Sequence, residues 1–125
     1  MAVLRITKED LKQKLDATDE ALRPVLVDVR LRYPFEHSTL KLPGAIRWAP
    51  GEPQPPTLPR DRELALYDSD PDEITSVTVA AGLARSGYRV CVLKGGLPEW
   101  AAANFPTDTK DAVRSVPPPA PAPKV

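Results

Sequence analysis

The sequence has little cysteine, no net charge and no long apolar run. Its 125 residues include one cysteine, Cys91, so an internal disulfide and a cysteine-based metal cluster are excluded. Lysine plus arginine and aspartate plus glutamate number 17 each, which leaves no positive excess to neutralise nucleic-acid phosphates. No stretch approaches the roughly 20 apolar residues of a membrane span, and the N-terminus does not resemble a signal peptide. We therefore predict a cytoplasmic protein with neither nucleic acid nor membrane as a partner.

Proline, by contrast, is abundant and unevenly placed. Of the 16 prolines, one group punctuates residues 50–59 and another forms the C-terminal PPPAPAPKV. The first segment cannot lie inside a sheet and should be a surface connection. The second has almost nothing to bury and favours polyproline II. The sequence predicts one domain over residues 1–107 and a Pro-rich disordered tail over residues 108–125.

Local patterns predict alternating strands and helices. Strands are expected at residues 25–29, 45–48, 64–67 and 89–93, and helices at residues 8–15 and 97–103. Between the last two strands, apolar residues recur at helical spacing before a capping glycine, Gly87; they are Ile74, Val77, Ala81 and Ala84. A strand, helix and strand of this length form a right-handed parallel unit in nearly all proteins. The predicted fold class is α/β, a small parallel-stranded sheet with helices on both faces.

Three motifs resemble the rhodanese-like (sulfurtransferase) domain. VLVDVR, residues 25–30, is similar to a strand in the first half of that domain, and LPGA, residues 42–45, to its H-I-P-G-A turn. VLKGGLPEW, residues 92–100, is similar to its C-terminal signature, in which two glycines precede a helix bearing a tryptophan. The resemblance covers roughly residues 6–105 and implies the single-domain rhodanese-like fold. The family-motif residues that it identifies are Asp28, Arg30, Gly95, Gly96 and Trp100.

The segment YDSDPDEITS, residues 67–76, falls at the position of the family's active-site loop. Many single-domain members have there a Tyr-Cys pair followed by Pro, Glu and Ser, and this chain matches that order with Tyr67, Asp68, Pro71, Glu73 and Ser76. The resemblance thus places Asp68 where the family has its nucleophilic cysteine. That cysteine carries sulfur as a persulfide, which backbone N–H groups of the loop hold. The equivalent loop here comprises Asp68, Ser69, Asp70, Pro71, Asp72, Glu73 and Ile74.

Aspartate cannot perform the chemistry of that cysteine. A carboxylate forms no persulfide and is a far weaker nucleophile toward sulfur than a thiolate. Asp68 can instead supply a permanent anion to N–H groups near a helix N-terminus, and Asp70, Asp72 and Glu73 can share this role and repel anionic sulfur donors. We expect no catalytic residue, no metal and no cofactor. The predicted function is a catalytically inactive rhodanese-like domain that binds or regulates an unidentified protein partner carrying a basic patch.

Three alternatives remain. Sulfur transfer through another thiol would have to use Cys91, which lies in a predicted strand where burial raises a thiol pKa. Asp68-Ser69-Asp70 after an apolar strand resembles the start of the haloacid-dehalogenase phosphatases, which would make the protein a metal-assisted hydrolase using Asp68. For a metal site without catalysis, the spacing of Asp68, Asp70 and Asp72 also resembles the first half of an EF-hand loop, but Glu73 stands where that loop needs glycine. The third alternative is an adaptor that works mainly through the Pro-rich tail.

Overall fold

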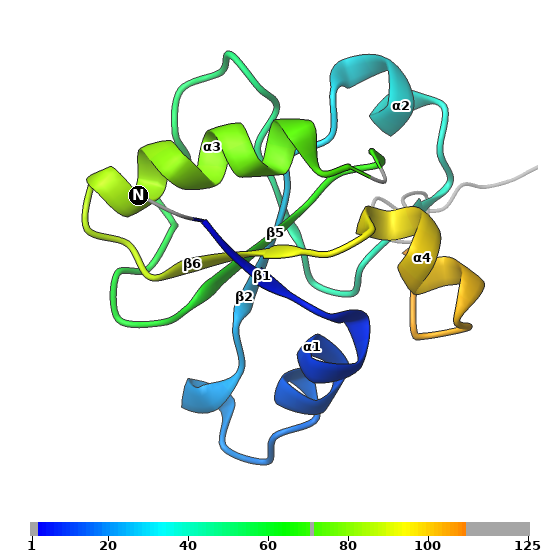
Figure 1. Ribbon diagram of the computed structural model, residues 1–125, viewed down its shortest axis with the longest axis horizontal. Coiled ribbons are helices and arrows are strands. Elements are labelled where there is room, and N and C mark those ends of the chain that lie inside the picture. Colours follow the sequence, from blue (N-terminus) through cyan, green and yellow to red (C-terminus); the bar gives the residue numbers. More distant parts are fainter. Residues whose placement is uncertain (1–2, 71, 110–125) are drawn as a thin grey trace, which may run out of the picture.

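The computed structural model describes residues 3–70 and 72–109 (Figure 1). Its centre is a five-stranded parallel sheet with the strand order β1-β6-β5-β2-β4. In that order, the strands are Leu4–Ile6, Val90–Leu93, Leu64–Tyr67, Val25–Asp28 and Ile46–Arg47. The predicted α/β class with a parallel sheet is confirmed.

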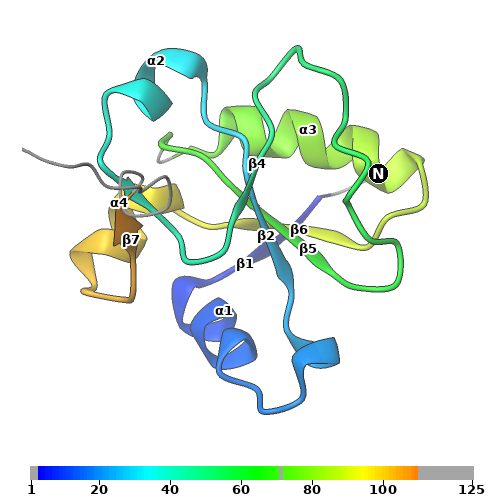
Figure 2. The ribbon, with the colours of Figure 1, turned by 180° about the vertical axis from the view of Figure 1, so that it is seen from behind.

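Helices cover both faces of this sheet. Helix α3 (Ile74–Arg85) lies on one face, and α1 (Lys8–Leu15) and α4 (Gly96–Ala102) lie on the other (Figures 1 and 2). Each face has its own core, and Ala80 and Leu83 of α3 belong to one while Leu11 of α1 and Trp100 of α4 belong to the other. Burial on both faces explains the nearly continuous apolar runs of β2, β5 and β6.

Several local predictions hold at their expected bounds. Helix α1 begins where Thr7 caps it, because the Thr7 hydroxyl accepts the N–H of Asp10 at 3.1 Å. Strand β5 matches the predicted residues 64–67, and all four are buried. Gly87 follows α3 with a positive φ of 94°, as a glycine at a helix end often does.

The predicted apolar stripe of α3 lies only partly against the sheet. Val77 packs against the core, but Ile74 is 63% exposed. The buried residues are Ser76, Ala80 and Leu83. Val79 also packs against this core, so the face of α3 that meets the sheet is rotated from the predicted stripe. The first helical residue, Ile74, remains beside the loop.

Short elements add to the predicted set. These unpredicted elements are β1, the 3-10 turn η1 (Glu20–Leu22), α2 (Arg32–Glu36) and a two-stranded antiparallel sheet of β3 (Leu40–Lys41) and β7 (Asp108–Thr109). Strand β7 corrects the predicted boundary at residue 107, because Asp108 and Thr109 pair with β3 rather than belonging to a disordered tail. The remainder of that predicted tail, residues 110–125, lies outside the described residues. Across the described ranges, no helix combines the length and apolar character needed to cross a membrane.

The strand order defines where a ligand site belongs. After β2 the chain moves outward to β4, whereas after β5 it moves through α3 to β6 on the opposite side. Ligands of open α/β sheets bind at such a switch point, beyond the carboxyl ends of the strands. In the sheet, Asp28 pairs with Tyr67, so the segments that follow β2 and β5 emerge side by side.

Candidate functional site

Asp68 stands at this switch point, and its carboxylate points inward. It is only 2% exposed. Oδ1 accepts the N–H of Asp70 at 2.9 Å, and Oδ2 accepts the N–H of Ser76, in the first turn of α3, at 2.7 Å. The helix dipole and the unpaired N–H groups of a first turn both favour an anion here. The carboxylate thus accepts hydrogen bonds from N–H groups of its own loop and of the first turn of α3.

Glu73 makes a different interaction from the one expected. It adopts a left-handed conformation with φ 55° and is 5% exposed. Its Oε2 accepts the N–H of Gly95 at 3.0 Å, and its Oε1 forms an ion pair with Nε of Arg5 on β1. Arg5 was not predicted as a site residue, because no local sequence pattern links it to a residue so distant along the chain.

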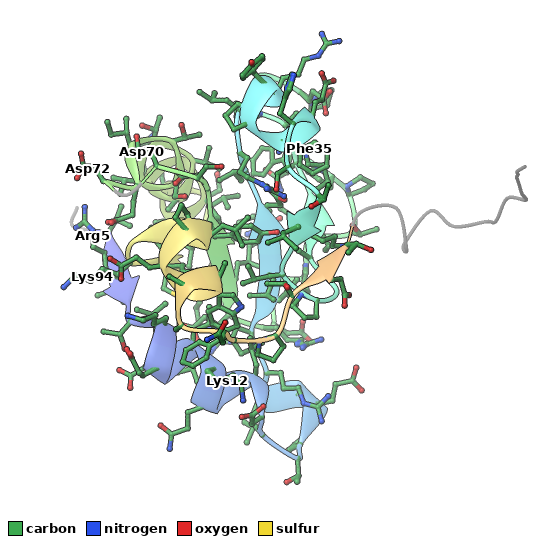
Figure 3. All side chains as sticks on the ribbon, turned by 90° about the vertical axis from the view of Figure 1, so that its right-hand side faces the viewer. Arg5, Lys12, Phe35, Asp70, Asp72 and Lys94 are labelled. Atoms are coloured by element: carbon green, nitrogen blue, oxygen red, sulfur yellow. The ribbon has the colours of Figure 1, made fainter. Side chains whose placement is uncertain are left out.

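Asp70 and Asp72 form the outer part of the loop. Oδ1 of Asp70 accepts the N–H of Asp72 at 2.8 Å, and the Asp70 carbonyl accepts the N–H of Glu73 at 2.9 Å. Figure 3 shows both aspartates at the outer edge, with Arg5 and Lys94 on the same side of the molecule. Ser69 and Asp70 are half-buried, whereas Asp72 and Ile74 are exposed. Pro71 lies outside the described residues.

The glycine pair of the C-terminal motif meets this loop directly. Gly95 and Gly96 both have positive φ, 80° and 66°. A Cβ on Gly96 would lie 2.5 Å from the carbonyl oxygen of Asp68. That carbonyl accepts the N–H of Leu97 at 2.9 Å. Glycine is required at Gly96 for the close approach as well as for the backbone conformation.

Asp28 and Arg30 form a buried brace beside the loop. Their side chains are 3% and 0% exposed, and the closest contact joins Arg30 Nη2 to Asp28 Oδ2 at 2.6 Å. Arg30 Nη2 also donates to the carbonyl of Leu40 at 3.0 Å. The hydroxyl of Tyr67 donates to Asp28, and burial together with this carboxylate raises the pKa of Tyr67 well above its usual range. The brace fixes β2, β5 and β3 relative to one another.

Trp100 packs inside the structure. It is 1% exposed, and its indole N–H donates to the carbonyl of Pro106 at 2.8 Å. The ring of Phe105 meets it edge-on with centroids 5.1 Å apart. The family-motif tryptophan therefore anchors α4 to the segment that follows it.

Cys91 is part of the core between neighbouring strands. It is 3% exposed, and burial, followed by the nearby Glu63 carboxylate, raises the pKa of the thiol to about 12. A thiol with such a pKa is almost entirely protonated near neutral pH, and only the thiolate is a good nucleophile.

The acidic side chains of the loop do not converge on a common point. Within the described ranges, no three histidine, cysteine, aspartate or glutamate side chains are placed to hold a metal ion together. The inward orientation of Asp68 and the exposed position of Asp72 fit that finding.

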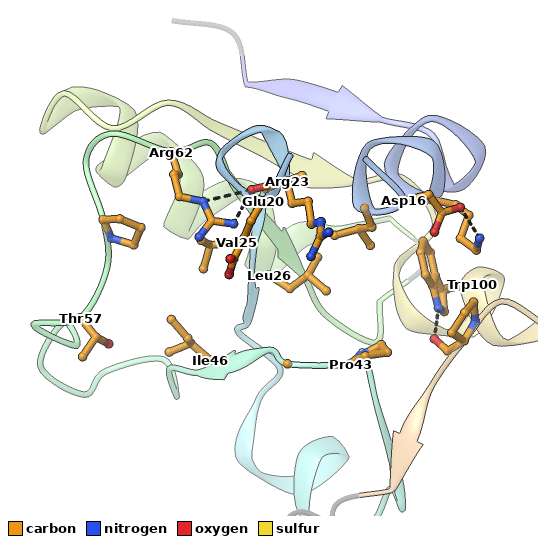
Figure 4. Close-up of a pocket in the computed structure, with 16 residues that line it drawn as sticks. Asp16, Glu20, Arg23, Val25, Leu26, Pro43, Ile46, Thr57, Arg62 and Trp100 are labelled. Atoms are coloured by element: carbon orange, nitrogen blue, oxygen red, sulfur yellow. Dashed lines mark hydrogen bonds and ion pairs between the residues drawn. The ribbon is translucent and has the colours of Figure 1, made fainter. Parts of the chain in front are cut away.

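A groove of about 760 Å³ lies away from the loop (Figure 4). It is bounded by α1 and η1 on one side and by the Pro43-Gly44 turn and the Pro-rich connection on the other. Arg62 crosses part of it and donates to the carbonyl of Arg23 at 2.7 Å. None of the residues that line this groove belongs to residues 68–74.

Comparison with known proteins agrees with this geometry. The family model of the rhodanese-like domain matches residues 7–103. The chain belongs to the rhodanese-like domain family.

Solved structures with the same fold include three from different organisms. A rhodanese-related protein of Thermoplasma volcanium is 20% identical, with a TM-score of 0.64 over 83% of this chain and 96% of that chain. The Alr3790 protein of Anabaena sp. is 26% identical, with a TM-score of 0.66 over 86% of this chain and 85% of that chain. A rhodanese-like domain protein of Staphylococcus aureus is 20% identical, with a TM-score of 0.63 over 78% of this chain and 91% of that chain. Among curated proteins there was no significant match.

Proposed function

We propose that this rhodanese-like domain does not transfer sulfur and acts as a binding or regulatory module through the loop between β5 and α3. The observation that carries the proposal is the pair of hydrogen bonds from the N–H groups of Asp70 and Ser76 to the Asp68 carboxylate. In the family, N–H groups of this loop hold an anionic persulfide. In this chain they are engaged by a side chain that cannot carry sulfur.

The number of cysteines and their burial support the same proposal. Cys91 is the one cysteine of the sequence, and it is buried away from the loop with a raised pKa. A persulfide carrier needs a thiolate that a donor can reach. Cys91 borders a pocket beside Leu4 and Glu63, but it is only 3% exposed and its raised pKa keeps it protonated, so it does not meet this need.

Charge indicates the kind of partner. The Glu73 carboxylate is neutralised by Arg5, whereas Asp70 and Asp72 form no ion pair among the described residues. Two outward carboxylates favour a basic surface on the partner and speed its association at low salt. We propose that a protein carrying a basic patch binds this loop.

Sulfur transfer from thiosulfate to cyanide tests the catalytic half of the proposal. The natural protein should be inactive. Asp68→Cys in a Cys91→Ser background places a single thiol beside the N–H groups of Asp70 and Ser76, and this variant should gain activity. Asp68→Ser in the same background is the matched control, since it keeps a small polar side chain without sulfur and should stay inactive.

Two other outcomes are informative. Activity in the natural protein that Cys91→Ser abolishes would overturn the proposal and make Cys91 the sulfur carrier. Inactivity of both the natural protein and Asp68→Cys would still support a non-catalytic domain, but it would show that the acidic loop no longer forms a working persulfide site.

A further inference from the structure

Large apolar side chains are exposed at the same end of the sheet as the loop. Leu31, which precedes α2, is 53% exposed, and Tyr33 within α2 is 71% exposed. Ile74, the first residue of α3, is 63% exposed. Large apolar side chains that gather on one surface mark a site of interaction more often than isolated ones do.

The topology places the segments that carry these three residues on two sides of the loop. Leu31 and Tyr33 follow the carboxyl end of β2, and Ile74 follows the loop after β5. Because β2 and β5 are adjacent and parallel, both segments leave the sheet at one edge. Figures 1 and 3 show α2 and the beginning of α3 at that same end, with Asp70 and Asp72 on the α3 side.

The fold does not account for this exposure. The buried face of α3 is formed by other residues, so Ile74 adds little to the core. Tyr33 stacks on His37 with centroids 4.0 Å apart, but His37 is itself exposed. An exposed tyrosine is a side chain that protein interfaces use as an anchor, because it buries a large area at a small entropic cost.

The neighbouring charges decide what can cover this surface. Arg32 is paired with Glu36 and Arg5 with Glu73, so Asp70 and Asp72 outweigh the remaining charge of Lys94. The two aspartates repel phosphates, which disfavours nucleic acid and anionic membranes. A second copy of the chain, docked face to face, would bring two acidic surfaces together. A partner segment with lysine or arginine next to apolar side chains would complement both the two aspartates and the exposed apolar side chains.

We propose that the surface formed by Leu31, Tyr33, Ile74, Asp70 and Asp72 docks a basic amphipathic helix of a partner protein. The apolar stripe of that helix covers Tyr33 and Ile74, and its basic residues meet the two aspartates. This inference rests on the proposed binding function of the loop and names the class of partner.

Two synthetic helical peptides with an identical leucine stripe test the inference. One carries lysine on its polar face and the other carries glutamate. The lysine peptide should bind in a fluorescence anisotropy titration and shift the backbone amide NMR signals of Leu31, Tyr33 and Ile74, whereas the glutamate peptide should not. Equal binding of both peptides, binding of neither, or shifts confined to the opposite end of the sheet would overturn the inference.

Paired variants separate this inference from the proposed function. Tyr33→Ala with Ile74→Ala should weaken binding of the lysine peptide about tenfold. Leu4→Ala with Leu22→Ala is the matched control, since both leucines are 68% exposed but lie elsewhere, and it should leave the affinity unchanged. If Asp70→Asn with Asp72→Asn weakens binding but Tyr33→Ala with Ile74→Ala does not, the acidic binding surface stands and the amphipathic partner is refuted. Far-UV circular dichroism with a thermal melt confirms that each variant is folded.

Discussion

The hydroxyl of Tyr67 donates a hydrogen bond to Oδ2 of Asp28 at 2.9 Å. The same hydroxyl accepts the N–H of Leu42 at 3.1 Å, so one side chain at the end of β5 joins β2 and the segment after β3. Asp68 follows Tyr67 directly, and the loop therefore starts from a fixed position.

Removing that hydroxyl should destabilise the domain. Tyr67→Phe leaves the buried N–H of Leu42 without its partner, which costs about 1–3 kcal/mol in the free energy of unfolding. Urea denaturation measures this change. Tyr88→Phe is the control, because the Tyr88 hydroxyl binds Gln54 at the surface and its loss should have a much smaller effect. Equal losses in the two variants would contradict the role assigned to Tyr67.

The Asp28–Arg30 pair should be far more sensitive than a surface pair of the same kind. Asp28→Asn leaves the fully buried Arg30 guanidinium without its counter-charge, and breaking a buried pair in this way costs about 3–5 kcal/mol. Glu36→Gln breaks the exposed Arg32–Glu36 pair and should leave the unfolding midpoint nearly unchanged. Chemical denaturation of both variants in parallel provides the comparison, and a similar loss in each would show that the buried pair is not a structural brace.

Gly96 should tolerate a methyl group much less well than Gly44. Both residues have positive φ, but a Cβ at Gly44 meets nothing within 4 Å, whereas one at Gly96 collides with the Asp68 carbonyl. Gly44→Ala should therefore cost about 1–2 kcal/mol for the left-handed conformation alone. Gly96→Ala should cost more and should also shift the amide NMR signals of residues 68–70. Equal costs, with the loop signals unmoved, would show that the close approach does not matter.

Stability should fall in alkaline solution because of Cys91. Its pKa is 9.0 ordinarily and about 12 when buried, so the unfolded chain loses the proton first. The contribution of Cys91 to the free energy of unfolding should therefore be constant below about pH 9 and decrease as pH rises toward 12. In Cys91→Ser this decrease should begin later, near the ordinary Tyr67 pKa of 10.0, since the pKa of that phenol is also raised on folding. Urea midpoints across this pH range would contradict the assignment if the two proteins behaved alike.

The sequence predicted those structural features that depend on residues close together along the chain. Helix α1 was predicted from its N-terminal cap and the spacing of its apolar residues. Strand β5 was predicted from an apolar run that ends at a group of acidic residues. The inward hydrogen bonds of Asp68 agree with the anion expected at a helix N-terminus. The ion pair of Glu73 with Arg5 could not be predicted, because β1 meets the loop only in the folded sheet. The exposed position of Ile74 was also missed, since helical periodicity does not say which of two apolar faces will meet a sheet.

The pairing of β1 with β6 has a consequence for how the chain acquires its structure during synthesis. Leu4 lies beside Cys91, so the first strand made has no partner in this sheet until the last of its strands has left the ribosome. Contacts between distant parts of a chain form slowly, because the intervening segment must first be closed into a loop. Arg5 reaches Glu73 only from β1. The nascent protein should therefore complete the loop between β5 and α3 as one of its final folding events, after the central strands have assembled.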